Sequence, residues 1–329
     1  MSTPQHTTEH RDKTRTRQGA GALALSALIT LAIGALILHT GHRTTTPPTA
    51  SIAHPALSAA AVTTQASGLG DCLVNPYNQA RACYQACTEV ITLHGANQPA
   101  QTAHGATPER MRIIPNGVDY QGLSKLPQAS PSDPPTVALV GRVVPIKDIR
   151  TYLQAIRILR PQIPGLVALV MGPTDEDPGY CAGCKSLATE LGLSDTVQFT
   201  GQVDVTKHFP RMHVNVLTSL SESQPLSVLE AGAAGIPTVA TNVGSCREIL
   251  FGRSDEHPSL GDGGILTDVS SPEQTAAALG ALLRDQDRRR RLGLTMQERV
   301  KRYYDLNLVD DAYARIYRHH MEAPARKVA

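Results

Sequence analysis

The sequence predicts an α/β fold with a single parallel β-sheet, preceded by a transmembrane helix and a linker. Three observations predict it. From Pro135 onward, short β-branched runs alternate with segments of helical periodicity, and each run is bounded by Gly, Pro or a polar turn. Continuous apolar strands that alternate with helices indicate a parallel sheet covered on both faces. Ahead of them lies an uncharged stretch long enough to cross a bilayer.

The uncharged stretch runs from residue 19 to residue 38 and follows a polar tail at residues 1–18. A helix of this length spans about 30 Å, the thickness of the hydrocarbon core, so we expect a single transmembrane helix at 19–40. A cleaved signal peptide is the alternative, because residues 58–61 are small enough for a cleavage site, but its apolar region is usually about 7–15 residues long. Basic residues precede the span, and the positive-inside rule then places the rest of the chain outside the cytoplasm.

A flexible linker and a small N-terminal unit are expected between this span and the main domain. Residues 41–70 are rich in Thr, Ser, Ala and Pro, which is typical of a linker. Order is expected to resume near residue 71, with a helix at 80–87 and a strand at 90–93. Pro115-Asn116-Gly117 ends the next strand, because proline cannot donate a hydrogen bond and Asn-Gly favours a turn. We assign residues 71–119 to this unit.

The main domain is expected at residues 120–320, with five strands, four helices between them and a helical tail. The strands are expected at 136–140, 166–171, 197–200, 214–217 and 238–240, and the helices at 148–159, 184–191, 225–234 and 246–250. Residues 272–320 indicate three further helices, in which the charged run at 287–291 favours a solvated helix face over a site for an anionic ligand. Parallel sheets of this kind bind ligands at the carboxyl ends of their strands.

Composition excludes some functions. The formal net charge of +2 is too small for a nucleic-acid-binding face, so no nucleic acid partner is expected. Trp is absent, which rules out a carbohydrate platform of stacked Trp side chains. Cys181 and Cys184 form a lone CxxC pair, whereas a structural zinc site usually takes four ligands. We therefore interpret these cysteines as ordinary thiols beside a helix and expect no metal site.

The loop after the strand at 136–140 carries two cations, Arg142 and Lys147, beyond Gly141. The glycine permits a tight exit from the strand, and two positive groups can offset the charges of a diphosphate. The start of the following helix adds backbone N–H donors to the same place. Taken alone, an arginine and a lysine in a loop are more often surface charges than ligands.

Two carboxylates, Glu222 and Glu230, lie in the loop after the strand at 214–217 and in the helix that Pro225 opens. Carboxylates accept hydrogen bonds from pairs of donors, which suits sugar hydroxyls and a ribose diol. The structural alternatives are a helix cap for Glu222 and a buried ion pair for Glu230. A third loop follows the strand at 238–240, where Ser245 has the ordinary role of a helix N-cap.

In order and spacing, these motifs resemble the retaining glycosyltransferases of family 4, whose GT-B fold has two facing Rossmann-like domains. Glu222 and Glu230 match the E-x7-E motif of that family. Within it, the closest resemblance is to the glycosyltransferase of Pel exopolysaccharide synthesis. It rests on IPNGVD (114–119), VALVGRVVPIKD (137–148), MGPTDEDPGY (171–180), LTSLSESQPLSVLEAGAAGIPTVATNVGSCREI (217–249) and RYYDLNLVDDAYARIY (302–317).

The resemblance implies a role for each matching residue. Arg142 and Lys147 would bind the donor diphosphate and assist catalysis. Glu222 would face the transferred sugar, also as a catalytic residue, and Glu230 would bind the ribose hydroxyls. Three neighbours on the same loop would complete the donor site: Gln224, Pro225 and Leu226.

The resemblance also implies a reaction and its partners. A hexosyl unit would pass from a nucleotide sugar, expected to be a UDP-sugar, to a growing polysaccharide acceptor with retention of configuration. No cofactor or metal is expected, because cations of the protein neutralise the leaving diphosphate. Further partners would be the membrane, through the N-terminal helix, and a membrane complex for polysaccharide synthesis.

Two departures from the family leave alternatives open. Residues 71–119 amount to less than half of an N-terminal GT-B domain, so we interpret them as its remnant and residues 120–320 as the C-terminal, Rossmann-like half. Sugar nucleotides are cytoplasmic, which conflicts with the outward orientation expected of a single-pass membrane protein. The chain is then either an active glycosyltransferase completed by a partner or a dimer, or a non-catalytic donor-binding or scaffold module or truncated remnant.

Overall fold

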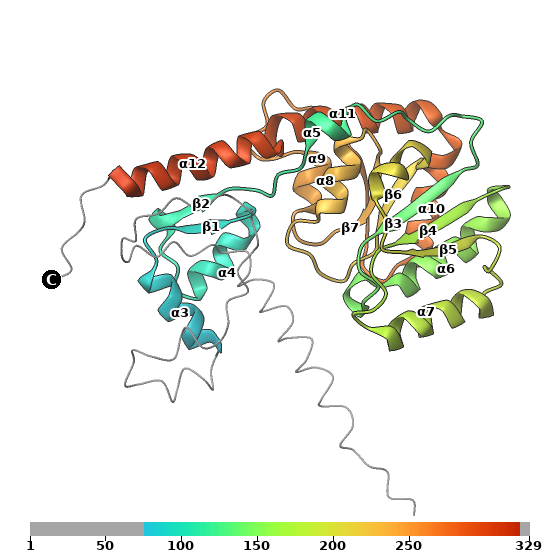
Figure 1. Cartoon of the computed structure of the whole chain (residues 1–329), viewed down its shortest axis with the longest axis horizontal. Helices are drawn as coiled ribbons and strands as arrows, with labels where there is room; N and C mark the ends of the chain where they lie inside the picture. Colours follow the sequence, from blue (N-terminus) through green and yellow to red (C-terminus); the bar gives the residue numbers. More distant parts are fainter. Residues whose placement is uncertain (1–75, 323–329) are drawn as a thin grey trace, which may run out of the picture.

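The computed structural model describes residues 76–322, which form a small N-terminal unit and a larger α/β domain (Figure 1). The small unit contains one pair of parallel strands, in which Val90 lies opposite Met111. Helices flank this pair, and Tyr84, Cys87 and Ala106 form its small core with residues of the two strands. Its elements are α3 (Pro76–Ala86), β1 (Val90–Thr92), α4 (Gln98–Ala103) and β2 (Met111–Ile113).

The larger domain is built on a six-stranded parallel sheet in the order β5-β4-β3-β6-β7-β8. The chain begins in the middle of the sheet, builds one half outward from β3, and returns to begin the other half at β6. Sheets wound in this way bind ligands where the strand order reverses, which here is between β3 and β6. The strands are β3 (Thr136–Val140), β4 (Val167–Met171), β5 (Val197–Gly201), β6 (Val214–Leu217), β7 (Thr238–Thr241) and β8 (Gly264–Thr267).

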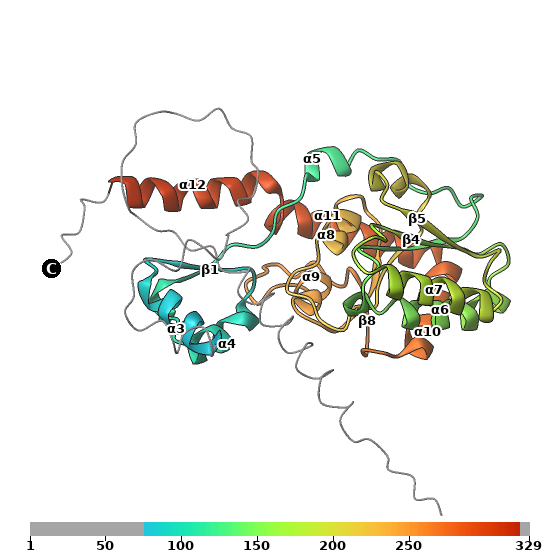
Figure 2. The same ribbon diagram turned by 60° about the horizontal axis from the view of Figure 1, so that its bottom comes forward.

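Helices cover both faces of this sheet, as the two views show (Figures 1 and 2). One buried core joins the sheet to α6, α7 and α10, and a second joins its other face to α5, α8, α9 and α11. In α6, buried side chains recur at Ile149, Leu153 and Ile156, the spacing of one helix face. These helices are α5 (Tyr120–Leu123), α6 (Ile149–Leu159), α7 (Pro178–Glu190), α8 (Leu226–Ala233), α9 (Cys246–Phe251), α10 (Pro272–Arg284) and α11 (Gln286–Tyr303).

The last helix, α12 (Leu306–Glu322), returns to the small unit instead of adding to the larger domain (Figure 1). Val309 is buried in a cluster with Ile91 and Ile114, against which Tyr313 and Ile316 also pack. The chain therefore connects the two parts twice, once before α5 and once between α11 and α12. Val118 ties these connections together, because its N–H donates to Tyr304 O at 2.9 Å and its carbonyl accepts from the N–H of Leu306 at 2.9 Å.

The five strands expected in the main domain are confirmed to within one residue at each end, and the tail contains the three helices expected between residues 272 and 320. Strand β8 was missed, because Gly264–Thr267 offers only two strongly apolar residues beside glycine and threonine. Helix α7 starts six residues earlier than expected, at Pro178, because Asp177 accepts a hydrogen bond from the N–H of Tyr180 and caps it. In both cases the element depends on features other than a run of apolar residues, which was the pattern used for the prediction.

The transmembrane part of the expected fold class is corrected, and so is the single-pass membrane placement. Within residues 76–322, no helix combines the length and the apolar character needed to cross a bilayer. The tail at 1–18, the expected span at 19–40 and the linker at 41–70 all lie outside the described residues.

Candidate functional site

The loops after β3 and β6 meet at the point where the strand order reverses, and hydrogen bonds join them. The N–H of Leu220 donates to Ile146 O at 2.8 Å. Thr218 Oγ1 donates to the carbonyls of Lys147 and Asp148, at 2.9 and 3.0 Å. Asp148 has φ 43°, in the left-handed region that few residues other than glycine enter, and its carboxylate caps α6. The backbone at this position is therefore held by contacts on both sides.

These joined loops bring Lys147 and Glu222 together. Lys147 Nζ lies 2.5 Å from Glu222 Oε1, which also accepts a hydrogen bond from Ser219 Oγ at 2.7 Å. Only 15% of the lysine side chain and 14% of the glutamate side chain are exposed. Such a pair is preorganised, because side chains with little access to solvent lose little freedom when a ligand arrives. Two of the residues assigned to the donor site from the sequence, Lys147 and Glu222, are therefore in contact.

Arg142 has a different partner. Its Nη1 lies 2.5 Å from Oε1 of Glu176, which belongs to the loop after β4, and both side chains are about half exposed, at 53% and 49%. The loops themselves lie close, because a Cβ on Gly172 would overlap the carbonyl of Gly141. The guanidinium is thus near the edge that carries Lys147, but it is paired with a carboxylate of another loop.

Glu230 lies in the second turn of α8, eight residues after Glu222 of the preceding loop, beside a cavity of about 490 Å³. The cavity is bounded by Leu226 at the start of α8, by Thr206, and by the chain from Gly117 to Leu126. Burial raises the pKa of Glu230, and no hydrogen bond or ion pair within residues 76–322 satisfies its carboxylate. The buried ion pair that was its structural alternative is therefore absent there, and the carboxylate keeps its capacity to accept hydrogen bonds.

The next residues of the Glu222 loop face the small unit. Oε1 of Gln224 accepts from the N–H of Asn116 at 2.5 Å, and its Nε2 donates to Leu93 O at 3.4 Å. Ser223 Oγ accepts from Nδ2 of Asn97 at 3.3 Å. Pro225 is the N-cap of α8, so the helix starts one residue later than expected. Sequence patterns gave no sign that Gln224 contacts Asn116, in the connection before α5.

The loop after β7 packs on the Glu222 loop from the other side. The N–H of Ser245 donates to Ser223 O at 2.9 Å, and a Cβ on Gly244 would overlap the carbonyl oxygens of Glu222 and Ser223. Ser245 stands at the N-cap of α9, but its side chain makes no capping bond and its buried Oγ has no partner among residues 76–322. Its expected capping role is therefore wrong. Burial and the nearby charge of Glu222 raise the pKa of Cys246 to about 12, which leaves this thiol neutral.

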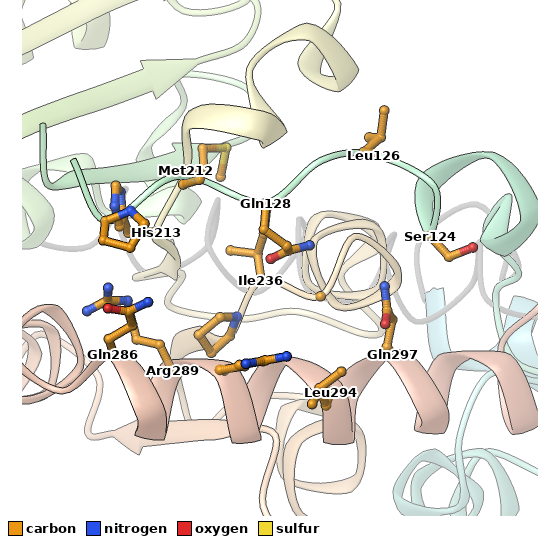
Figure 3. A pocket seen from close by; sticks show the side chains of 15 residues that line it. Ser124, Leu126, Gln128, Met212, His213, Ile236, Gln286, Arg289, Leu294 and Gln297 are labelled. Atoms are coloured by element: carbon orange, nitrogen blue, oxygen red, sulfur yellow. The ribbon is translucent and has the colours of Figure 1, made fainter. Parts of the chain in front are cut away.

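A cavity of about 520 Å³ lies at the opposite, amino-terminal end of the sheet, between α11 and the chain before β3 (Figure 3). Two of its polar groups have structural partners: Arg289 Nη1 donates to Leu282 O and Leu283 O, both at 2.7 Å, and His213 Nδ1 accepts from the N–H of Thr136. Arg289 thus turns inward and caps α10, unlike the exposed arginines beside it in the run at 287–291. None of the expected donor residues lines this cavity.

Two curated relatives are identical to this chain at about a third or fewer of the aligned positions. The D-inositol 3-phosphate glycosyltransferase of Thermomonospora curvata is 32% identical over 208 residues, which cover 57% of this chain and 46% of the relative. The lipopolysaccharide core biosynthesis glycosyltransferase LpsE of Rhizobium meliloti is 29% identical, over 57% of this chain and 51% of the relative. The chain spans about half the length of the curated relatives it matches.

Solved structures share the fold. The HepE protein of Anabaena, in complex with UDP and glucose, superposes with a TM-score of 0.63 at 21% identity, over 74% of this chain and 66% of that one. Sucrose-phosphate synthase from Thermosynechococcus elongatus gives a TM-score of 0.63 at 25% identity, over 74% and 61%.

The sequence family described as glycosyl transferases group 1 matches residues 124–299, more than half of the chain. This range contains the six-stranded sheet and all three loops that meet at the Lys147–Glu222 pair. The fold, the site at the carboxyl ends of the strands and the family match agree, and the chain belongs to the group 1 glycosyl transferases, with an α/β domain of the GT-B type.

Proposed function

We propose that this chain transfers a hexosyl unit from a UDP-sugar to a growing exopolysaccharide, with retention of configuration. The observation that carries the proposal is the Lys147–Glu222 pair at the reversal point of the sheet, with the unpaired carboxylate of Glu230 on the next helix. Lys147 and Arg142 would hold the diphosphate, Glu222 the sugar and Glu230 the ribose. The neighbouring loop residues Pro225 and Leu226 would complete the donor site.

The chemistry needs a stabilised leaving group more than it needs a strong base. The bond from the anomeric carbon to the diphosphate oxygen breaks, and its electron pair leaves with the diphosphate. The acceptor hydroxyl forms the new bond to the same carbon and gives its proton to the departing diphosphate. A cation held in place before the reaction stabilises the charge that develops on the leaving oxygen. Lys147 has this property, and on this basis no metal ion is required.

Three details of the proposal have separate support. The UDP donor is supported by the UDP that HepE holds, although a relative from Mycobacterium tuberculosis is a GDP-mannose-dependent mannosyltransferase. The exopolysaccharide acceptor and the retaining outcome are supported by the resemblance of the sequence motifs to those of family 4 and of the Pel glycosyltransferases. The experiment therefore has to vary the nucleotide, the sugar and the acceptor independently.

Calorimetry with UDP and GDP on the full chain tests donor binding first. We expect UDP to bind and GDP to bind less well, and Lys147→Ala to weaken UDP binding. Arg157→Ala is the matched control, because Arg157 is an exposed cation on α6, the helix that follows Lys147, and has no partner within residues 76–322. Absence of UDP and GDP binding at millimolar concentration would refute the donor site.

Turnover is tested by release of UDP from a panel of UDP-sugars with oligosaccharide acceptors, and the anomeric configuration of the product is read by NMR. A product with the configuration of the donor supports the proposal, and an inverted product contradicts retention. Binding of UDP without turnover of any sugar nucleotide would support the other hypothesis, a non-catalytic donor-binding module.

A further inference from the structure

The side chain of Gln224 bridges the two parts of the molecule at the loop that carries Glu222. It is only 5% exposed, and both ends of its amide bond to the small unit: Oε1 to the N–H of Asn116 at 2.5 Å and Nε2 to Leu93 O at 3.4 Å. Nδ2 of Asn116 returns a bond to the carbonyl of Gln224 at 3.1 Å. Each end of the amide therefore has one hydrogen-bonding site in use and one left, but burial leaves little of the side chain accessible to a ligand.

The partners of Gln224 follow the two strands of the small unit, on the side that faces the larger domain. Leu93 follows β1, and Asn116 follows β2 in the segment that leads into α5. We call the connection at residues 114–119, between β2 and α5, the hinge segment. It is tightly packed, because a Cβ on Gly117 would lie 2.8 Å from Leu306 Cα at the start of α12. Gln224 is therefore attached to the segment through which the two parts would move relative to each other.

The Glu222 loop is held between this hinge and two neighbouring loops. On one side, Ser223 O accepts from the N–H of Ser245. On the other, the Glu222 carboxylate accepts from Lys147 and from Ser219 Oγ. Only one residue separates Glu222 from Gln224, so a shift of the bridge at Gln224 displaces the Glu222 backbone unless the intervening residue absorbs it.

We propose that Gln224 is a positioning residue. Its two side-chain hydrogen bonds hold the Glu222 loop against the hinge segment, so that Lys147 and Glu222 are in contact while the small unit packs on the larger domain. The inference rests on the proposed function for its catalytic consequence. It replaces the direct donor contact that the sequence motif implied for Gln224. The chemistry of the residue fits the role, because an amide accepts from Asn116 and donates to Leu93 at once, and neither a carboxylate nor a thioether does both.

Hydrogen–deuterium exchange of the ligand-free full chain tests the lock directly. Gln224→Met keeps the length of the side chain and removes both bonds, so exchange should rise about tenfold at the amides of Asn116 and Ser245 together. Gln224→Glu keeps the acceptor for Asn116 and loses the donor to Leu93, so its effect should be intermediate. Gln154→Met on the exposed face of α6 is the control and should leave both segments unchanged.

Kinetics distinguish positioning from donor contact. For Gln224→Met, kcat should fall about 10- to 100-fold while the KM for the donor changes less than about threefold, because the geometry of the reacting groups suffers more than binding does. The thermal midpoint is measured in parallel. If Gln224→Met does not fold, Gln224→Glu carries the same measurements.

Three results would overturn the proposal: unchanged exchange at Asn116 and Ser245, a loss of UDP affinity as large as that of Lys147→Ala, or a kcat unaffected in a variant with faster exchange. A wild-type chain that neither binds UDP nor turns over a UDP-sugar would refute the proposed function instead. In that case the exchange measurements, which need no ligand, still decide whether Gln224 locks the loop.

Discussion

The two cations of the loop after β3, Lys147 and Arg142, differ in their exposure to solvent and in their ion-pair partners. Lys147 is mostly buried and bonded to Glu222, a member of the same motif set, whereas Arg142 is half exposed and bonded to Glu176 on a neighbouring loop. The resemblance implied the same role for both, which is to bind the donor diphosphate and to assist catalysis. In the structure, the two cations differ in burial and in the carboxylate that each one contacts.

The spacing of residues in a motif therefore identifies candidate ligands, but it does not rank them by their contribution to binding. A buried cation is already oriented and desolvated, so its interaction with a developing charge is strong. An exposed arginine must leave Glu176 and lose side-chain freedom before it contributes, and exposed ion pairs are worth only about 0.2–1 kcal/mol. We therefore expect Lys147 to dominate catalysis and Arg142 to modulate affinity.

Lys147→Ala should have the largest effect. It removes the preorganised cation and leaves the carboxylate of Glu222 mostly buried without its charged partner. Turnover should fall by about 100- to 1000-fold, as when a single preorganised donor to a developing charge is lost. The measurement is kcat/KM for UDP-sugar turnover, with Arg157→Ala as the control. A loss of less than tenfold would remove the distinction between Lys147 and Arg142.

Glu230→Gln should have the next largest effect, about 1.5 kcal/mol of UDP affinity, because a neutral acceptor binds ribose hydroxyls less strongly than a carboxylate does. Burial raises the pKa of Glu230 in the folded chain, so wild-type affinity should decline as the pH falls through that raised pKa. The affinity of Glu230→Gln should not follow this decline. Calorimetry across the acidic range, with Glu273→Gln as an exposed control, measures both.

The same pKa shift makes a prediction for stability. A carboxyl whose pKa is higher in the folded than in the unfolded chain favours folding while it is protonated, and this contribution is lost as the pH rises through the folded pKa. Glu230→Gln should therefore unfold at a higher temperature than wild type at neutral pH, and the difference should vanish below the ordinary pKa of 4.5. A difference independent of pH would contradict the assigned cause.

How far the sequence predicted this molecule depended on whether a feature is local. Strands and helices follow from apolar periodicity, and the meeting of Lys147 with Glu222 follows from the rule that parallel strands place their carboxyl ends at one edge. Contacts that the strand order does not dictate left no such pattern. The fully buried pair of Arg299 with Glu256 is one example, and the bridge of Gln224 to Asn116 is another. Both depend on packing across the fold, which periodicity does not encode.

Arg142→Ala should have a smaller effect than Lys147→Ala, about 1 kcal/mol of UDP affinity, because part of what the arginine gains from the diphosphate is offset by the loss of its contact with Glu176. Its effect on kcat at saturating donor should be less than about threefold, as expected for a residue that binds ground state and transition state alike. Calorimetry and steady-state kinetics give the two quantities. A kcat loss equal to that of Lys147→Ala would show that the arginine moves fully into the site during the reaction.

Glu176→Gln should have the smallest effect, and in the opposite direction. Removing the charge frees Arg142 without altering Lys147, so UDP affinity should rise by about 0.2–1 kcal/mol, the worth of an exposed ion pair. The gain should shrink as salt is added, because half-exposed charges are screened. Glu190→Gln, which removes an exposed carboxylate at the end of α7 with no partner in the described chain, is the matched control. A loss of affinity in Glu176→Gln would mean that Glu176 orients Arg142 toward the diphosphate instead of competing for it, and the two cations would then be equally preorganised.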